Sequence, residues 1–119
     1  MYTILEKEFF GKKSVYLSGN FDIPFSATVQ DILEKKEKRG VIVIEVSSFM
    51  SHAIGKSSLT PVFSPDYTIF TNFESDHQNW HIDLQEYLDA KMNLVLHTKK
   101  RSILNVQIQN RSHDFGLAL

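Results

Sequence analysis

Polar side chains that could do chemistry follow three hydrophobic segments, each at the point where a predicted strand ends. Ser18-Gly19-Asn20 follows the first segment, Glu45 directly follows the second, and Thr71-Asn72 with Asp76-His77 follows the third. Ligands of open parallel sheets bind outside the carboxyl ends of the strands, so we expect these residues to form one site. Because the chain has no Cys, its chemistry must come from carboxylates, His, Lys, hydroxyls or backbone groups.

Glu45 is the most unusual of these residues because it follows four branched apolar residues, 41–44. A carboxylate that continues a buried strand is costly to desolvate unless a cation or hydrogen-bond donors meet it. Two interpretations follow. Either the strand reaches the surface at Glu45, or the carboxylate binds a cation.

Lys91 is the second unusual residue, because the spacing of its neighbours places it on an apolar helix face. It follows Leu84 by seven residues and Leu88 by three, and it precedes Val95 by four. Its stem could pack there while the ammonium reaches solvent. Alternatively, a lysine directed at the sheet could supply catalytic charge or be chemically modified.

Asp76, His77 and His81 form a third cluster. His77 and His81 are four residues apart, which is a metal-ligand spacing if the segment is helical. A small metal-dependent hydrolase that uses Glu45 with these three residues is therefore one alternative. No complete metal-hydrolase motif is present to support it.

The order of the predicted elements places these residues in an α/β fold. We expect three helices, over 2–10, from Ser26 or Thr28 to a C-cap at Gly40, and over 84–97. We expect strands over 14–18, 41–44, 67–71 and 102–106. Residues 50–65 are expected to be irregular. The continuous apolar run 41–44 indicates a strand covered on both faces. Alternating strands and helices favour a mainly parallel sheet covered by helices.

Composition indicates a single domain and excludes several classes of function. The chain has 119 residues, with 13 Lys and Arg against 14 Asp and Glu, which gives no sign of nucleic-acid binding. Its longest apolar runs are about four residues, whereas a membrane span needs roughly 20. We therefore expect a cytoplasmic protein with neither membrane nor nucleic-acid partners. Residues 55–57 (Gly-Lys-Ser) lack the first glycine of a phosphate-binding loop.

Three segments together resemble the central, ATP-binding domain of the Mur ligase family. Residues 19–24 resemble the family's Gly-Asn-Ile-Gly-x-Pro turn, and residues 45–49 (Glu-Val-Ser-Ser-Phe) resemble its strand end. Residues 71–91 resemble the family's third motif. In that motif, Thr-Asn is followed by Asp-His, then by His or Tyr, and later by Tyr and Ala-Lys. The resemblance implies a three-layer fold like that of phosphate-loop NTPases. Phe49 after the two serines resembles the motif of the D-glutamate-adding members more than the Ser-Ser-His typical of the tripeptide-forming members. The tripeptide-forming members are the alternative.

The resemblance also implies a reaction and roles for individual residues. Such ligases use ATP to phosphorylate a substrate carboxylate, and an amino acid then attacks the acyl phosphate. Glu45 and His77 would hold Mg²⁺, and Asp76 would orient His77. Lys91 would be carbamylated and help to position a metal, and His77 and Lys91 would be the catalytic residues. Asn20 and Ser47 would contact the substrate, UDP-N-acetylmuramoyl-L-alanine, to which D-glutamate is added.

The same resemblance indicates what this chain lacks. The family's phosphate loop would precede the first helix, and its UDP-binding N-terminal domain and its C-terminal domain have no counterpart in residues 1–119. We therefore expect a partial central domain that is inactive alone and that exposes a sheet edge prone to self-association. The alternative is a non-catalytic module that binds the UDP-muramoyl substrate.

Overall fold

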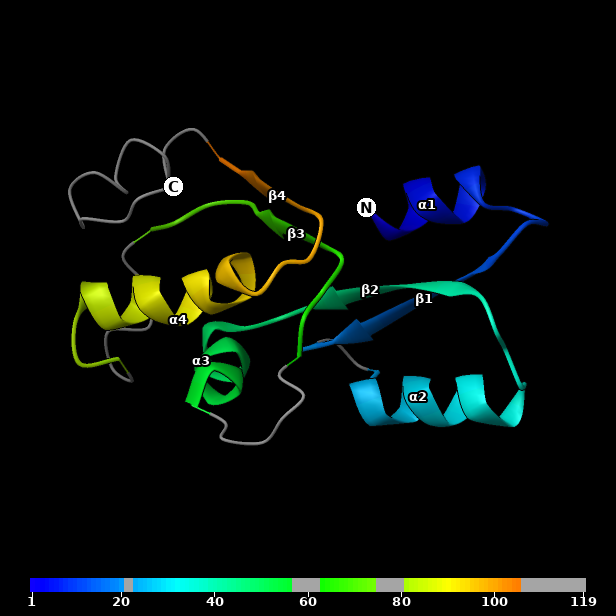
Figure 1. Ribbon diagram of the computed structural model, residues 1–119, viewed down its shortest axis with the longest axis horizontal. Coiled ribbons are helices and arrows are strands. Elements are labelled where there is room, and N and C mark those ends of the chain that lie inside the picture. The colour runs from blue at the N-terminus through cyan, green and yellow to red at the C-terminus, as the bar shows by residue number, and fades with distance from the viewer. Residues whose placement is uncertain (21–22, 57–62, 75–80, 106–119) are drawn as a thin grey trace. The chain divides into compact units, whose positions relative to one another are not determined.

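The computed structural model describes residues 1–20, 23–56, 63–74 and 81–105, which form helices and parallel strands (Figure 1). They belong to two compact units, Met1–Val46 and Ser47–Leu119. Each unit holds two helices and a two-stranded parallel sheet. The predicted α/β character with parallel strands is confirmed.

The first unit contains one complete strand–helix–strand crossover. Its elements are α1 (Tyr2–Glu8), β1 (Ser14–Gly19), α2 (Phe25–Glu34) and β2 (Gly40–Glu45). The register of the two strands runs from Ser14 opposite Gly40 to Gly19 opposite Glu45. Parallel strands require such a crossover because they cannot be joined by a tight turn. The carboxyl ends of β1 and β2 therefore meet, as predicted.

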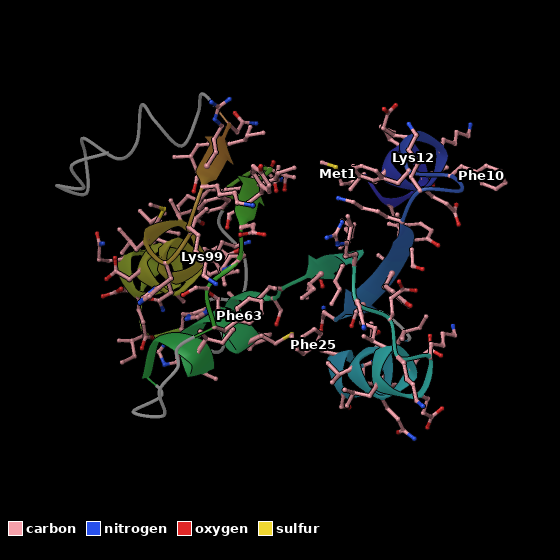
Figure 2. The ribbon with its side chains drawn as sticks, turned by 45° about the vertical axis from the view of Figure 1, so that its right-hand side comes forward. Met1, Phe10, Lys12, Phe25, Phe63 and Lys99 are labelled. Carbon is pink, nitrogen blue, oxygen red and sulfur yellow. The ribbon has the colours of Figure 1, made fainter. Side chains whose placement is uncertain are left out.

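Helix α1 begins at Tyr2 as predicted and ends at Glu8, two residues before the predicted end. Gly11 has a φ of 70°, and the Lys12 and Lys13 amides bond to the Phe9 carbonyl, which closes the last turn. Phe10 follows the helix with 85% of its surface exposed, and its side chain extends away from the ribbon (Figure 2).

Two predicted boundaries of the second helix are wrong. Pro24 is the N-cap of α2, so Ser26 and Thr28 lie inside the helix and neither begins it. At the other end, Lys36 rather than Gly40 adopts a positive φ, of 50°, and its amide bonds to the Leu33 carbonyl. Gly40 begins β2 instead.

The apolar strand β2 also differs from the prediction. Ile42 is 37% exposed, so full coverage of both strand faces is not found. Val41 and Val43 are half-buried.

The second unit holds the hydrophobic core. Its elements are α3 (Ser48–Lys56), β3 (Tyr67–Phe70), α4 (Leu84–Leu96) and β4 (Arg101–Leu104). Strands β3 and β4 pair in parallel, with Tyr67 opposite Arg101 and Phe70 opposite Leu104. The buried cluster consists of Phe70, Phe73, Tyr87, Leu88 and Met92, with Leu84, Val95 and Leu104 packed against it. The predicted apolar stripe of α4 is therefore confirmed.

The prediction of irregular structure over residues 50–65 is wrong for its first part, because α3 begins at Ser48. Ser-rich sequence favours caps and turns, but here the serines bond the helix to its neighbour. Ser51 donates to the Ala90 carbonyl, and the Asn93 amide donates to the Ser51 carbonyl at 3.2 Å. Packing against α4 therefore stabilises a helix that local propensity alone does not indicate.

No helix within the described ranges is both long and apolar enough to cross a membrane.

Candidate functional site

In the first unit, a glycine turn brings Asn20 to the end of β2. Gly19 has a φ of 120°, and a Cβ at this position would lie 2.0 Å from the Glu45 carbonyl oxygen. The Asn20 amide donates to that same carbonyl at 3.0 Å, and the Gly19 amide donates to the Ile23 carbonyl at 3.1 Å. Only glycine permits this close approach of two backbones. The predicted neighbours Asn20 and Glu45 therefore lie together, with Asn20 exposed.

The Glu45 carboxylate is suited to a cation. Its Oε2 atom is buried and has no hydrogen-bond partner within the described part of the chain. A buried carboxylate oxygen without a donor carries an uncompensated desolvation cost, which a bound cation would offset. Carboxylate oxygens are the ligands that Mg²⁺ prefers, so this residue fits the predicted ion.

In the second unit, Ser47 caps the N-terminus of α3. Its Oγ accepts from the Met50 amide at 3.3 Å, and its carbonyl accepts from the Ser51 amide at 3.0 Å. A serine at this position satisfies helix amides that otherwise lack a partner. Ser47 is half-buried, and its hydroxyl proton remains available for a second bond while the oxygen caps the helix.

Lys91 lies on α4 with its ammonium over two aromatic rings. Nζ is 5.1 Å from the centre of the Tyr87 ring and 5.5 Å from that of Phe70. Aromatic faces attract a cation, so this geometry suits the charged lysine. An ammonium has no lone pair for a metal, so Lys91 in this form does not fit the predicted metal site. Carbamylation would be needed to make it a ligand.

Two predicted site residues, Asp76 and His77, lie outside the described residues. The predicted helical pairing of His77 with His81 is therefore untested, although His81 itself precedes α4 and is not in a helix. Among the described residues, no three His, Asp or Glu side chains are grouped so that they could hold a metal ion.

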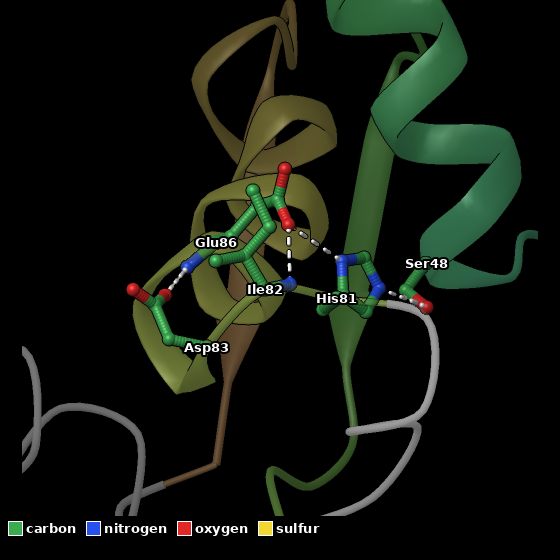
Figure 3. A network of polar contacts seen from close by, with 5 residues as sticks. All are labelled: Ser48, His81, Ile82, Asp83 and Glu86. Atoms are coloured by element: carbon green, nitrogen blue, oxygen red, sulfur yellow. Dashed lines mark hydrogen bonds and ion pairs between the residues drawn. The ribbon is translucent and has the colours of Figure 1, made fainter.

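His81 contacts Ser48 and Glu86, which sequence reasoning did not pair with it (Figure 3). Its Nε2 lies 3.0 Å from Ser48 Oγ, and its Nδ1 lies 3.9 Å from Glu86 Oε2. The same Glu86 oxygen accepts from the Ile82 amide at 2.8 Å, while Asp83 accepts from the Glu86 amide at 2.8 Å. The spacing Asp83-x-x-Glu86 is that of a helix capping box and could have indicated this arrangement.

Two side chains on the helices of the first unit have a shifted pKa. The pKa of Lys35 is raised, chiefly by its hydrogen bond to Asp31. The pKa of Tyr2 is raised, chiefly by its hydrogen bond to Glu6. Lys35 is exposed and Tyr2 is half-buried, and each bond joins residues four apart in one helix, so both act on local helix stability.

The amino-acid sequence matches a known family. The profile of the Mur ligase middle domain matches residues 1–116. The chain belongs to this family. The resemblance predicted from residues 19–24, 45–49 and 71–91 is therefore confirmed.

Several similar curated proteins share one name, UDP-N-acetylmuramoylalanine--D-glutamate ligase. The protein from Aquifex aeolicus is 40% identical over 90 residues, 76% of this chain and 18% of its own length. The protein from Oleidesulfovibrio alaskensis is 35% identical over 82 residues, which are 69% of this chain and 17% of its own length. That from Natranaerobius thermophilus is 34% identical over 104 residues, 87% of this chain and 20% of its own length.

This Mur ligase chain thus spans about a fifth or less of the length of the curated relatives it matches. No solved structure gives a significant match to it.

Proposed function

We propose that this chain is part of the central domain of an ATP-dependent ligase that adds D-glutamate to UDP-N-acetylmuramoyl-L-alanine in the cytoplasm. The observation that supports this most strongly is the name shared by relatives that are 34–40% identical over most of the chain. The family match over residues 1–116 supports the same class of ligase. The phosphate loop and the flanking domains would lie in other parts of the complete protein.

In this proposal, Asn20 and Ser47 bind the UDP-muramoyl substrate. Asn20 is exposed at the turn beside Glu45, which leaves its amide side chain accessible to a ligand. Ser47 is fixed by the first turn of α3, so its hydroxyl is presented from a rigid helix terminus. Both side chains can donate and accept hydrogen bonds, as a polar sugar nucleotide requires.

Glu45 and His77 would hold Mg²⁺, with Asp76 orienting the His77 imidazole. The buried Glu45 Oε2 without a hydrogen-bond partner among the described residues supports the first of these roles. When bound, Mg²⁺ offsets the negative charge of the phosphoryl group that is transferred. Lys91 joins the site as an anion only after its deprotonated amine adds CO2 to form a carbamate, with loss of one proton.

The reaction has two steps. The substrate carboxylate attacks the γ-phosphorus of ATP, which forms an acyl phosphate and releases ADP. The amine of D-glutamate then attacks the acyl carbon, an amide bond forms, and inorganic phosphate leaves together with one proton. The chain's own residues bind and orient the carboxylate, because phosphoryl transfer depends mainly on positioning and electrostatics.

A ligation assay of the complete protein encoded by the gene tests this function. With ATP, Mg²⁺ and UDP-N-acetylmuramoyl-L-alanine, D-glutamate should give a product heavier by one glutamyl residue, and one inorganic phosphate should be released for each product formed. A parallel reaction with a diamino acid and the UDP-muramoyl dipeptide tests the tripeptide-forming alternative. Product only in the second reaction would contradict the proposed substrate.

Binding without catalysis is the second candidate function, supported by the Asn20 turn and the Ser47 cap, each formed within its own unit. Calorimetric titration of the 119-residue chain with UDP-N-acetylmuramoyl-L-alanine in the absence of ATP measures it. Saturable binding supports a module that keeps the substrate surface, and the absence of heat excludes it.

A further inference from the structure

His81 connects the N-termini of two helices in the second unit. It is only 2% exposed, and its partner Ser48, the first residue of α3, is 3% exposed. The His81–Ser48 contact of 3.0 Å joins α3 to the segment that leads into α4 (Figure 3). On its other side, the ring faces Glu86, which caps the start of α4.

The order Ser48, His81, Glu86 resembles a nucleophile with its base and orienting acid, but its burial contradicts that role. A nucleophilic hydroxyl must reach its substrate, and Ser48 is almost completely enclosed. The distance of 3.9 Å from His81 Nδ1 to Glu86 Oε2 is also longer than a hydrogen bond. The group is therefore suited to holding structure in place.

Aromatic contacts fix the orientation of the His81 ring. The Phe49 ring is stacked with it at 5.9 Å between centres, and the Tyr87 ring is tilted against it at 5.1 Å. His52, one turn after Ser48 on α3, meets it edge-on at 6.1 Å. A ring held on these sides directs Nε2 at Ser48 without freedom to swing away.

Ser47, the residue before Ser48, is the link to function. Its Oγ caps α3 through the Met50 amide, and one peptide bond joins it to Ser48, so a shift of Ser48 would move the backbone that carries the Ser47 hydroxyl. We propose that His81 is a positioning residue: it holds Ser48, and through it the Ser47 turn, in the orientation that binds the UDP-muramoyl substrate. This inference rests on the role proposed above for Ser47.

Matched variants of the 119-residue chain separate positioning from general stability. His81→Phe keeps a ring but removes both nitrogens, whereas His81→Gln places an amide nitrogen near the position of Nε2. Ser48→Ala removes the partner hydroxyl. Ser51→Ala is the control, because Ser51 is similarly buried on α3 and its hydroxyl donates to the Ala90 carbonyl on α4.

Two measurements are made on each variant. The nuclear magnetic resonance shift of the Met50 amide reports directly on the Ser47 cap and needs no ligand. Calorimetry gives the Kd for UDP-N-acetylmuramoyl-L-alanine. Thermal melting identifies any variant that has unfolded, in which case the His81→Gln and Ser48→Ala pair decides the result.

We expect His81→Phe and Ser48→Ala each to shift the Met50 resonance and to raise Kd by roughly 3- to 10-fold, the effect of losing one ordering hydrogen bond. The double variant should be no weaker than either single one, because both remove the same contact. His81→Gln should restore most of the affinity. Ser51→Ala should lower the melting temperature and leave Kd unchanged.

An unchanged Met50 resonance in His81→Phe, or an equal loss of affinity in Ser51→Ala, would overturn the inference. If the unaltered chain does not bind the nucleotide, the proposed binding role of Ser47 in this chain fails. The Met50 resonance alone then shows whether His81 fixes the turn.

Discussion

The two units of this chain position their strand ends by different means. All buried hydrophobic residues in the described part of the chain lie between Phe70 and Met92, in the second unit. In the first unit, the residues classed as buried are Ser18 and Thr28, which are polar. An open cavity of about 440 Å³, partly lined by Leu17 and Ala27, lies against β1 and α2 of that unit.

The residues proposed for the site depend on different interactions in the two units. Lys91 and Ser47 are held by helices that pack on a core and on each other. Asn20 and Glu45 are held by backbone hydrogen bonds between two strand ends, with one glycine that permits their contact. We therefore expect the first unit to be sensitive at its turn and the second at its core.

The largest expected effect is the loss of a core side chain from the second unit. Leu88 is 1% exposed, so Leu88→Ala should lower the free energy of unfolding by about 2–5 kcal/mol. Leu17→Ala in the first unit should cost about 1 kcal/mol, because Leu17 is half-buried beside an open cavity. Denaturant unfolding followed by circular dichroism measures both. Equal losses would remove the contrast between the two units.

Gly19→Ala tests the turn of the first unit. The new Cβ would collide with the Glu45 carbonyl, and the positive φ of residue 19 adds strain. We therefore expect the free energy of unfolding to fall by about 2–3 kcal/mol. Gly11→Ala is the matched control, since Gly11 also has a positive φ but nothing lies within 4 Å of an added Cβ. This control should cost about 1 kcal/mol. If both variants unfold at the same denaturant concentration, the close contact at Glu45 is not what fixes the turn.

Asp83→Ala tests the cap of α4 and has a smaller expected effect. Asp83 accepts from the Glu86 amide at 2.8 Å, and losing such a cap costs about 1 kcal/mol. Asp83→Asn should keep most of the stability because asparagine also caps helices. Thermal melting of the two variants compares them directly. A destabilised Asn variant would show that the charge of Asp83 matters more than its hydrogen bond.

The smallest expected effect is a pH dependence in the first unit. Folding raises the pKa of Lys35 above its ordinary value of 10.5, chiefly through the hydrogen bond to Asp31. The stability that the charged Lys35 contributes is therefore fully present below the pKa of Lys35 in the unfolded chain. It is lost as the pH rises through the pKa of Lys35 in the folded chain. Because Lys35 is exposed, the change should be slight, and Asp31→Asn should remove most of it. Stability measured on both sides of the unfolded pKa tests this sign.

Much of the fold follows from patterns that the sequence displays. The apolar spacing of Leu84, Leu88 and Val95 predicted α4, and the branched run 41–44 predicted β2. These elements could be recognised because their side chains repeat with the period of a helix or form a continuous strand. The ends of the predicted strands also indicated Asn20 and Glu45 as neighbours, and the register of β1 and β2 confirms this.

The missed features depend on contacts between distant residues. Helix α3 follows serines that favour turns, and it forms against Ala90 and Asn93, about 40 residues away. The end of α2 uses Lys36 in a conformation typical of glycine, which no local rule predicts for lysine. The His81–Ser48 contact spans 33 residues and likewise has no periodic signal.

The central proposal is that Glu45, at the carboxyl end of β2, binds the Mg²⁺ of a ligase. The most direct test is D-glutamate ligation by the complete protein over a range of Mg²⁺ concentrations, with and without Glu45→Gln. We predict that the variant folds at least as stably as the unaltered protein, because a buried charge is removed. We also predict that its ligation is slower by at least roughly 10- to 100-fold, the typical cost of losing a residue that hydrogen-bonds to a metal ligand. Ligation at the original rate with an unchanged Mg²⁺ requirement would contradict the account.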